Sequence, residues 1–283
     1  MQVHVIYDNP TFTLTYIVYD HVTKDAVIID PVLDYDSGTS TISFNNINIY
    51  KDFISKNNLK LHWILETHAH ADHLTGAAKL KEIYPAAKTG IGSNITEVQK
   101  TFKEIFNNKD MKTDGSQFDQ LIAEGERLNA GSITITTHFT PGHTPACVTY
   151  EIENHLFTGD TIFHHDYGTG RCDFPQGSAE QLYHSIKNKI FKYPDDTLIH
   201  PGHDYPPSSR DVCSETTVEL EKKFNPQLKD DTTKEEFINF RTERDKKLKA
   251  PRLLLQSIQF NIVAGMMQPE DDGNIYLKLP LKT

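Results

Sequence analysis

The chain is poor in cysteine, in basic charge and in long apolar runs, and each shortage excludes a class of protein. Its three cysteines, Cys147, Cys172 and Cys213, are odd in number and scattered, which argues against a disulfide framework and favours a reducing cytoplasm. No stretch approaches the roughly 18 apolar residues of a membrane span, and Met1–Tyr7 resembles a strand rather than a signal peptide. Lysine and arginine number 29 against 39 acidic residues among 283, and the net charge of −10 argues against nucleic acid and anionic membranes as partners.

Histidine, in contrast, is concentrated. Residues 67–73 read Thr-His-Ala-His-Ala-Asp-His directly after the apolar run Leu61–Leu65, which is typical of a buried strand. At a strand end, the alternating His68 and His70 can converge on one ion, whereas Asp72 and His73 point toward a neighbouring site. Imidazole and carboxylate ligands suit Zn(II), Fe(II) or Mn(II) better than Cu(I). The motif therefore predicts a metal site.

Three further ligand candidates occur in the same local setting. His143 lies in Thr-Pro-Gly-His-Thr-Pro, Asp160 closes Leu-Phe-Thr-Gly-Asp, and His203 lies in Ile-His-Pro-Gly-His-Asp. Each follows a short strand-like run and sits in a glycine-containing turn, where a rigid scaffold presents functional side chains. The repeated setting is a stronger indication of a metal centre than any single motif.

The ligand set alone leaves two chemistries open. His68, His143 and Asp160 can form a two-histidine, one-carboxylate face, which suits Fe(II) that binds both a substrate and dioxygen. Alternatively, Asp160 bridges to a second ion in a dinuclear zinc site that hydrolyses esters or amides. In that site His70 would also bind the first ion, and Asp72, His73 and His203 would hold the second.

Residues near these ligands are candidates for supporting roles. Arg171 and Asp173 are expected to form an ion pair that orients ligands such as the imidazoles of the histidine motif, with substrate contact an equal alternative for Arg171. Tyr205 follows His203 by two positions, and we expect its phenol near the metal. Cys147 and Cys172 have no adjacent base in sequence and are interpreted as packing residues.

The pattern of apolar residues predicts an α+β fold in which helices cover the outer faces of sheets. Helices are expected at about 46–57, from Asp72 onward, at 178–191, 216–224 and 234–248, and strands at 2–7, 14–19, 26–30, 87–91, 133–138, 147–152, 155–158 and 197–200. Residues 92–118 read as an insertion, with an amphipathic helix at 95–106 followed by a polar loop. We expect it to pack on the core, with a lid or subunit contact as the alternative. Residues 1–283 are interpreted as one domain, with a mainly helical extension at 213–283.

The order of these motifs resembles the metallo-β-lactamase superfamily, and most closely a bacterial subgroup of its persulfide dioxygenase branch. The motifs are His68-Ala-His70-Ala-Asp72-His73, Pro141-Gly-His143-Thr-Pro145, Phe157-Thr-Gly-Asp160, Gly170-Arg-Cys-Asp-Phe174 and Pro201-Gly-His203-Asp-Tyr205. The first two mark the superfamily, and the last two are more selective for the branch. The chain departs from mitochondrial-type members at Gln227, which follows Asn225-Pro226 where they carry arginine, at Ser178, which is often cysteine in them, and in its longer 92–118 insertion.

The resemblance implies an αββα sandwich with the metal at one edge of two mixed sheets. It implies one Fe(II) per chain, bound by His68, His143 and Asp160, with the other cluster residues in support. The implied reaction oxidises glutathione persulfide, or a similar small persulfide, with O₂ to sulfite and thiol in sulfide detoxification. Arg171 and Tyr205 would hold the substrate, with Asp173 supporting Arg171. A zinc-dependent, glyoxalase II-like thioester hydrolase is the alternative, and the acidic surface and amphipathic insertion are compatible with a homodimer.

Overall fold

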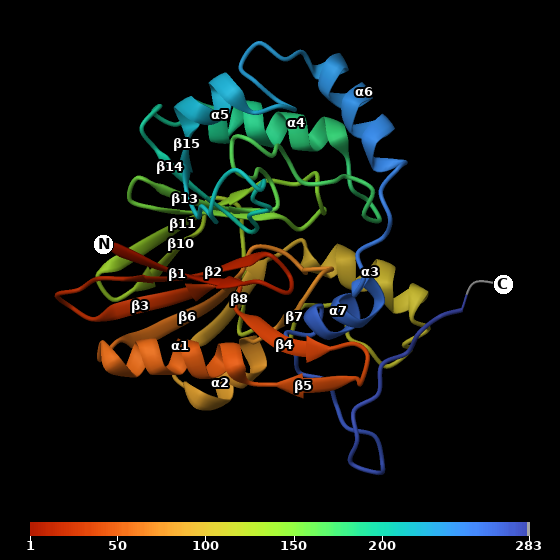
Figure 1. Ribbon diagram of the computed structural model, residues 1–283. Coiled ribbons are helices and arrows are strands. Elements are labelled where there is room, and N and C mark those ends of the chain that lie inside the picture. Colours follow the sequence, from red (N-terminus) through yellow and green to blue (C-terminus); the bar gives the residue numbers. More distant parts are fainter. Residues whose placement is uncertain (282–283) are drawn as a thin grey trace.

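Two six-stranded sheets face each other in the computed structural model, which describes residues 1–281, and helices cover their outer faces (Figure 1). This arrangement confirms the predicted αββα sandwich. The last two positions of the expected C-terminal extension, 282–283, lie outside the described residues.

The first sheet has the order β1-β2-β3-β6-β8-β9 and the second the order β10-β11-β12-β13-β14-β15. In the first sheet, β1 to β3 pair antiparallel, and β3, β6, β8 and β9 pair parallel. The second sheet is antiparallel except for the parallel pair β13 and β14. The first-sheet strands are Gln2–Asp8, Thr13–Tyr19, Asp25–Ile29, Lys60–Glu66, Lys88–Gly92 and Gln120–Ile122, and those of the second are Arg127–Ala130, Ile133–Phe139, Val148–Ile152, His155–Gly159, Leu198–Pro201 and Thr216–Thr217.

The main core lies between the two sheets. Tyr16 and Ile29 of the first sheet and Ile135 and Phe157 of the second belong to one buried apolar cluster. Because successive side chains of a strand point to opposite faces, the neighbouring Ile28 packs on the other side of the first sheet. The strands are therefore apolar on both faces, as sheets covered on both sides require.

Helices supply the two outer layers. α1 (Asn45–Lys56) and α2 (Ala77–Ile83) cover the first sheet, while α4 (Ala179–Asn188), α5 (Val218–Phe224) and α6 (Lys234–Asp245) lie over the second (Figure 1). A short 3₁₀ helix spans Ile190–Lys192. Among residues 1–281, no helix combines the length and apolar character needed to cross a membrane.

The metal-binding motifs meet because their strands end at the same edge of the sandwich. β13 and β14 run parallel, and Gly202 N–H donates to the Gly159 carbonyl at 2.9 Å, so the turns after these strands lie side by side. Val148 N–H donates to the Thr67 carbonyl at 2.9 Å and links the histidine loop to the second sheet. Only glycine fits at 142, where φ is +144° and an added Cβ would lie 2.4 Å from the Leu182 backbone.

The helix expected from Asp72 begins later, at Ala77. Leu74 and Thr75 instead form a short strand, β7, that pairs antiparallel with β4 (Val32–Asp36). β5 (Thr41–Ser43) completes this three-stranded sheet. A strand of two residues is too short to leave a periodic pattern in the sequence, which explains why the helix was predicted to begin too early.

The inserted segment packs on the body of the protein. α3 (Ile95–Ile105) buries Ile95, Val98 and Phe102 in a cluster that includes Phe174 and Ile258. Ile258 belongs to α7 (Leu254–Asn261), which lies within the extension expected to be mainly helical but was not predicted as an individual helix. The insertion and the C-terminal region therefore support each other and flank the edge that carries the metal-binding motifs.

Arg241 fastens α6 to the rest of the molecule. Its guanidinium is 1% exposed, pairs with Asp245, and donates to the Gln227 amide oxygen at 2.8 Å and the Thr169 carbonyl at 3.1 Å. Asp245 in turn accepts from Cys172 N–H at 2.8 Å. The ion pair thus joins α6 to the loop that follows Asp160.

We expect Arg241→Met to lower the free energy of unfolding by about 3–5 kcal/mol, because it leaves the Asp245 carboxylate buried without its partner. Chemical denaturation measures the change. Lys246→Met, which removes an exposed pair with Glu243, is the control and should leave stability nearly unchanged, because exposed ion pairs contribute little. Equal effects of the two substitutions would contradict the anchoring role of Arg241.

Glu221 gives a pH-dependent prediction. Burial raises the pKa of this carboxyl well above its usual value, although Oε2 accepts a hydrogen bond from Asn225 Nδ2 at 2.7 Å. A raised pKa in the folded state means that stability is full below the unfolded pKa and falls as pH rises through the folded one. We therefore expect Glu221→Gln to stabilise the protein more at pH 8 than at pH 5, with a difference of at least about 1 kcal/mol in the free energy of unfolding. The melting temperature at each pH measures the change. The exposed Glu219→Gln is the control, and a gain that is the same at both pH values would contradict the explanation.

Candidate metal centre

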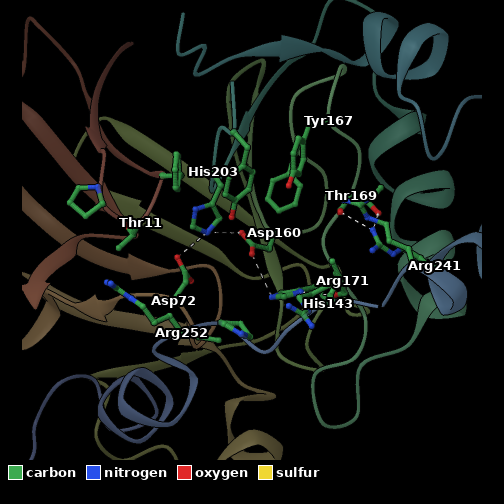
Figure 2. A pocket seen from close by; sticks show the side chains of 18 residues that line it. Thr11, Asp72, His143, Asp160, Tyr167, Thr169, Arg171, His203, Arg241 and Arg252 are labelled. Atoms are coloured by element: carbon green, nitrogen blue, oxygen red, sulfur yellow. Dashed lines mark hydrogen bonds and ion pairs between the residues drawn. The ribbon is translucent and has the colours of Figure 1, made fainter. Parts of the chain in front are cut away.

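Two histidines and one aspartate come together at the strand edge. Asp160 Oδ2 lies 3.6 Å from His143 Nε2 and 4.0 Å from His68 Nε2, and all three residues are buried. They form a group whose ligand atoms could hold one ion. His143 and Asp160 point toward each other at the floor of a pocket (Figure 2). The three residues come from loops after β6, β11 and β13.

Hydrogen bonds fix the orientation of both imidazoles. His143 Nδ1–H donates to the Arg171 carbonyl at 2.6 Å, because a carbonyl can only accept. The Thr67 hydroxyl donates to Asp30 at 2.8 Å, so it accepts from His68 Nδ1–H at 3.0 Å. In both rings Nε2 is therefore left with its lone pair toward Asp160, the state in which imidazole binds a metal.

Buried polar atoms without partners test whether a metal fits here. Among the described residues, His68 Nε2, His70 Nδ1, His73 Nε2 and Asp160 Oδ1 have no hydrogen-bond partner, although such atoms are normally satisfied. Burial, followed by the neighbouring imidazoles, lowers the pKa of His68 well below its usual value and keeps the ring neutral. Neutral imidazoles and a carboxylate with unused lone pairs suit a divalent first-row metal ion, so the residues fit such an ion.

A second group of potential ligands adjoins the first. His203 Nε2 lies 3.4 Å from Asp72 Oδ2 and 3.4 Å from Asp160 Oδ1, and one nitrogen of His70 lies close to the ligand atoms of Asp72 and His203. The sequence analysis placed His73 in this group instead. In the structure His73 Nδ1–H donates to the Leu74 carbonyl at 3.1 Å, and its ring centre lies 6.5 Å from that of His203.

His70 is also engaged by two buried carboxylates. Its Nε2 lies 3.0 Å from Asp30 Oδ1 and 3.3 Å from Glu66 Oε2. Burial alone would lower the pKa of His70, but these two carboxylates raise it well above its usual value. Neither acid was assigned a role from sequence. The available signal was an acidic residue directly after an apolar run, Ile28–Ile29 before Asp30 and Ile64–Leu65 before Glu66.

Asn261 is a further residue that the sequence analysis missed. Its Nδ2 donates to the carbonyls of His70 and His73, both at 2.8 Å, and its Oδ1 accepts from Thr75 N–H at 2.8 Å. This buried amide, nearly 190 positions further along the chain, therefore holds the histidine loop in shape. No local pattern in the sequence indicates that partnership.

The centre opens into a cavity of about 360 Å³, a size typical of sites for small ligands. Arg171 lines it, but its Nε pairs with Asp173 Oδ1 at 2.5 Å and its Nη1 donates to the Lys249 carbonyl at 2.8 Å. The expected Arg171–Asp173 pair is therefore present. It supports the loop, while the Arg171 carbonyl rather than Asp173 orients His143.

Tyr205 also lines the cavity, as expected. Its ring stacks on His203 with centres 5.5 Å apart and lies 4.8 Å from the ring centre of Tyr167. Burial, followed by the nearby Asp160 and Asp72, raises the pKa of the Tyr205 phenol, which therefore keeps its proton. A protonated phenol beside the metal ligands can donate a hydrogen bond to an anionic ligand.

The fold and the group of potential metal ligands are those of a metallo-β-lactamase-type protein. Residues 8–203 match the Metallo-beta-lactamase superfamily, and the chain belongs to this family. The matched region spans all the candidate metal ligands.

The chain is similar to several proteins that are named for an enzymatic activity. The chain is 50% identical over 268 residues to "Glyoxylase B2" of Dictyostelium discoideum, covering 94% of this chain and 91% of that protein. It is 31% identical to "Persulfide dioxygenase ETHE1, mitochondrial" of Homo sapiens, covering 93% and 89%. Among solved structures, ETHE1 from Myxococcus xanthus matches with a TM-score of 0.75 and 28% identity over 94% of this chain and 100% of that one. The "Beta-lactamase hydrolase-like protein" of Agrobacterium fabrum is 43% identical over 99% of this chain, which spans only 64% of that longer relative.

We expect His143→Ala to reduce bound metal to roughly a tenth or less of the wild-type content, since even loss of a residue that merely supports a ligand weakens metal binding about 10–100-fold. Elemental analysis of protein purified without oxygen measures it. The exposed His184→Ala is the matched control and should keep its metal. Full metal content in His143→Ala would exclude His143 as a ligand.

Proposed function

We propose that the protein is an Fe(II)-dependent persulfide dioxygenase that binds one iron per chain through His68, His143 and Asp160. The observation that carries the proposal is that His68, His143 and Asp160 form a ligand group of their own, while Nε2 of the neighbouring His70 lies beside the carboxylates of Asp30 and Glu66. A trio of two imidazoles and one carboxylate suits iron that must bind both substrate and dioxygen. The similarity to persulfide dioxygenases over most of the chain supports the same reading.

The proposed substrate is glutathione persulfide or a related small persulfide. The overall reaction converts persulfide, O₂ and water into thiol, sulfite and two protons, and four electrons pass from the persulfide sulfur to O₂. The bound iron would supply the sites at which sulfur and O₂ react.

The chain's own residues would prepare the reactants. Phe12, Phe163 and Tyr205 line the cavity beside His203 and would exclude water from the reacting sulfur. Tyr205 would hold its proton toward the anionic persulfide, and Arg171 would keep His143 in position through its carbonyl. No general base is required, because a persulfide is more acidic than a thiol and enters as an anion.

A zinc-dependent hydrolase of the glyoxalase II kind is the second candidate. It is favoured by the group of His70, Asp72 and His203, which adjoins the trio and could hold a second ion, and by the name of the Dictyostelium relative. Zinc ions held by these residues would supply activated water for hydrolysis of the thioester of a glutathione conjugate.

We expect iron-loaded protein to consume O₂ with glutathione persulfide and to release one sulfite per O₂. An oxygen electrode and sulfite analysis measure both quantities, and S-lactoylglutathione is the competing substrate. His68→Ala should abolish O₂ uptake together with iron, while the exposed His184→Ala should retain both. Zinc-loaded protein that hydrolyses S-lactoylglutathione, with no O₂ uptake from persulfide in the iron form, would reject the dioxygenase and favour the hydrolase.

A further inference from the structure

Four arginines line the cavity above the metal centre, and two of them are free. Arg171 pairs with Asp173, and Arg241 pairs with Asp245. Within residues 1–281, the guanidinium groups of Arg244 and Arg252 make no hydrogen bond or ion pair. Arg244 is half-buried and Arg252 is exposed, so both belong to the mouth of the cavity, above the buried metal ligands.

Both free arginines come from one segment of the C-terminal region. Arg244 lies in the last turn of α6, and Arg252 follows Pro251 just before α7. The segment between them is held down where Arg171 Nη1 donates to the Lys249 carbonyl at 2.8 Å. Since the carbonyl of Arg171 also accepts from His143, the arginine segment and a metal ligand attach to the same residue. The distance between the cavity mouth and the metal centre is therefore fixed by the fold.

The charge of the cavity is opposite to that of the chain. The chain carries a net charge of −10, whereas four arginines line this one cavity. Its two acidic residues, Asp72 and Asp160, both face His203 at the metal centre. In Figure 2, Arg252 lies on the side of Asp72 and Thr11, and Arg171 lies on the side of His143. A metal ion would add further positive charge, so the cavity favours an anion.

The walls around the free arginines are apolar. Leu248 and Pro251 lie between them in sequence and line the same cavity as Phe12. Apolar surroundings strengthen electrostatic attraction relative to open water. A guanidinium presents its N–H groups as a planar fork that matches the two oxygens of a carboxylate. These features suit a carboxylate in the part of the cavity that Arg244 and Arg252 line.

We propose that Arg244 and Arg252 bind carboxylates at the non-reacting end of the substrate and thereby set a preference for carboxylate-bearing persulfides over neutral ones. This inference rests on the proposed function for the identity of the reacting group. The arginines act on binding, so their effect falls on KM and on the Kd of unreactive analogues rather than on kcat.

Arg252 also borders a smaller cavity lined by Asp8, Asp34 and Asp36. If it served only to balance those acids, its loss would change stability and leave ligand binding intact. The experiment below separates the two roles, because it measures binding and unfolding on the same variants.

The test uses metal-loaded Arg244→Gln, Arg252→Gln and the double variant, with Arg127→Gln as the matched control. Arg127 is an exposed arginine of β10 outside the cavity. The Kd for S-methylglutathione is measured by calorimetry. O₂ uptake is measured with glutathione persulfide and with the persulfide of 2-mercaptoethanol, which has no carboxylate. Metal content and melting temperature are recorded for every variant.

We expect each single substitution to raise KM for glutathione persulfide and Kd for S-methylglutathione roughly tenfold, the usual worth of a charge-assisted hydrogen bond. The ratio of kcat/KM for the two persulfides should fall by the same factor, and Arg252→Lys should restore only part of it, because lysine lacks the fork. Arg127→Gln should match the wild type in every measurement.

An unchanged Kd in the double variant, or equal losses with both persulfides, would overturn the proposal. If Arg252→Gln changes only the melting temperature, the charge-balancing role is correct and the proposal is wrong for that residue. If the wild type consumes no O₂ with either persulfide while the variants still bind S-methylglutathione more weakly, the dioxygenase assignment fails and the arginine site stands. If the double variant consumes O₂ with an unaltered KM, the dioxygenase assignment stands and the arginine site is wrong.

Discussion

The buried carboxylate of Asp30 is the contact on which the metal centre depends. It accepts from the backbone N–H of Thr67 at 2.7 Å and from the Thr67 hydroxyl at 2.8 Å, and it lies 3.0 Å from His70 Nε2. Through Thr67 it sets the orientation of His68, and it lies directly beside His70. A single side chain at the end of β3 thus holds two histidines of the loop after β6, because these parallel strands are hydrogen-bonded neighbours.

The C-terminal region is part of the site rather than an appendage to it. Asn261 of α7 holds the histidine loop by three hydrogen bonds, and Asp245 of α6 binds the backbone of Cys172 in the loop that orients His143. The superfamily match ends at residue 203, so these contacts come from beyond the matched region. The candidate ligands therefore belong to the sandwich, whereas α6 and the segment that follows it line another part of the cavity, a division that lets one fold carry different binding sites.

Acidic and basic side chains also occupy different parts of the cavity. The acids that line the cavity face the metal centre, while the free guanidinium groups lie at its entrance. On a chain of net charge −10, such a local excess of positive charge favours an anionic ligand in this cavity.

The sequence by itself predicted the order of the motifs, the sandwich that presents them, and His68, His143 and Asp160 as candidate metal ligands, because each candidate follows an apolar run and carries its signal within a few residues. It also placed Arg171 beside Asp173 and Tyr205 beside His203. Only the tertiary structure decided that His70 rather than His73 joins Asp72 and His203, that α2 starts at Ala77, and that Asp30, Glu66 and Asn261 support the histidine loop. Those outcomes depend on side chains that meet across distant strands and helices, and hydrogen bonding between residues far apart along the chain leaves no periodic or local pattern in the sequence.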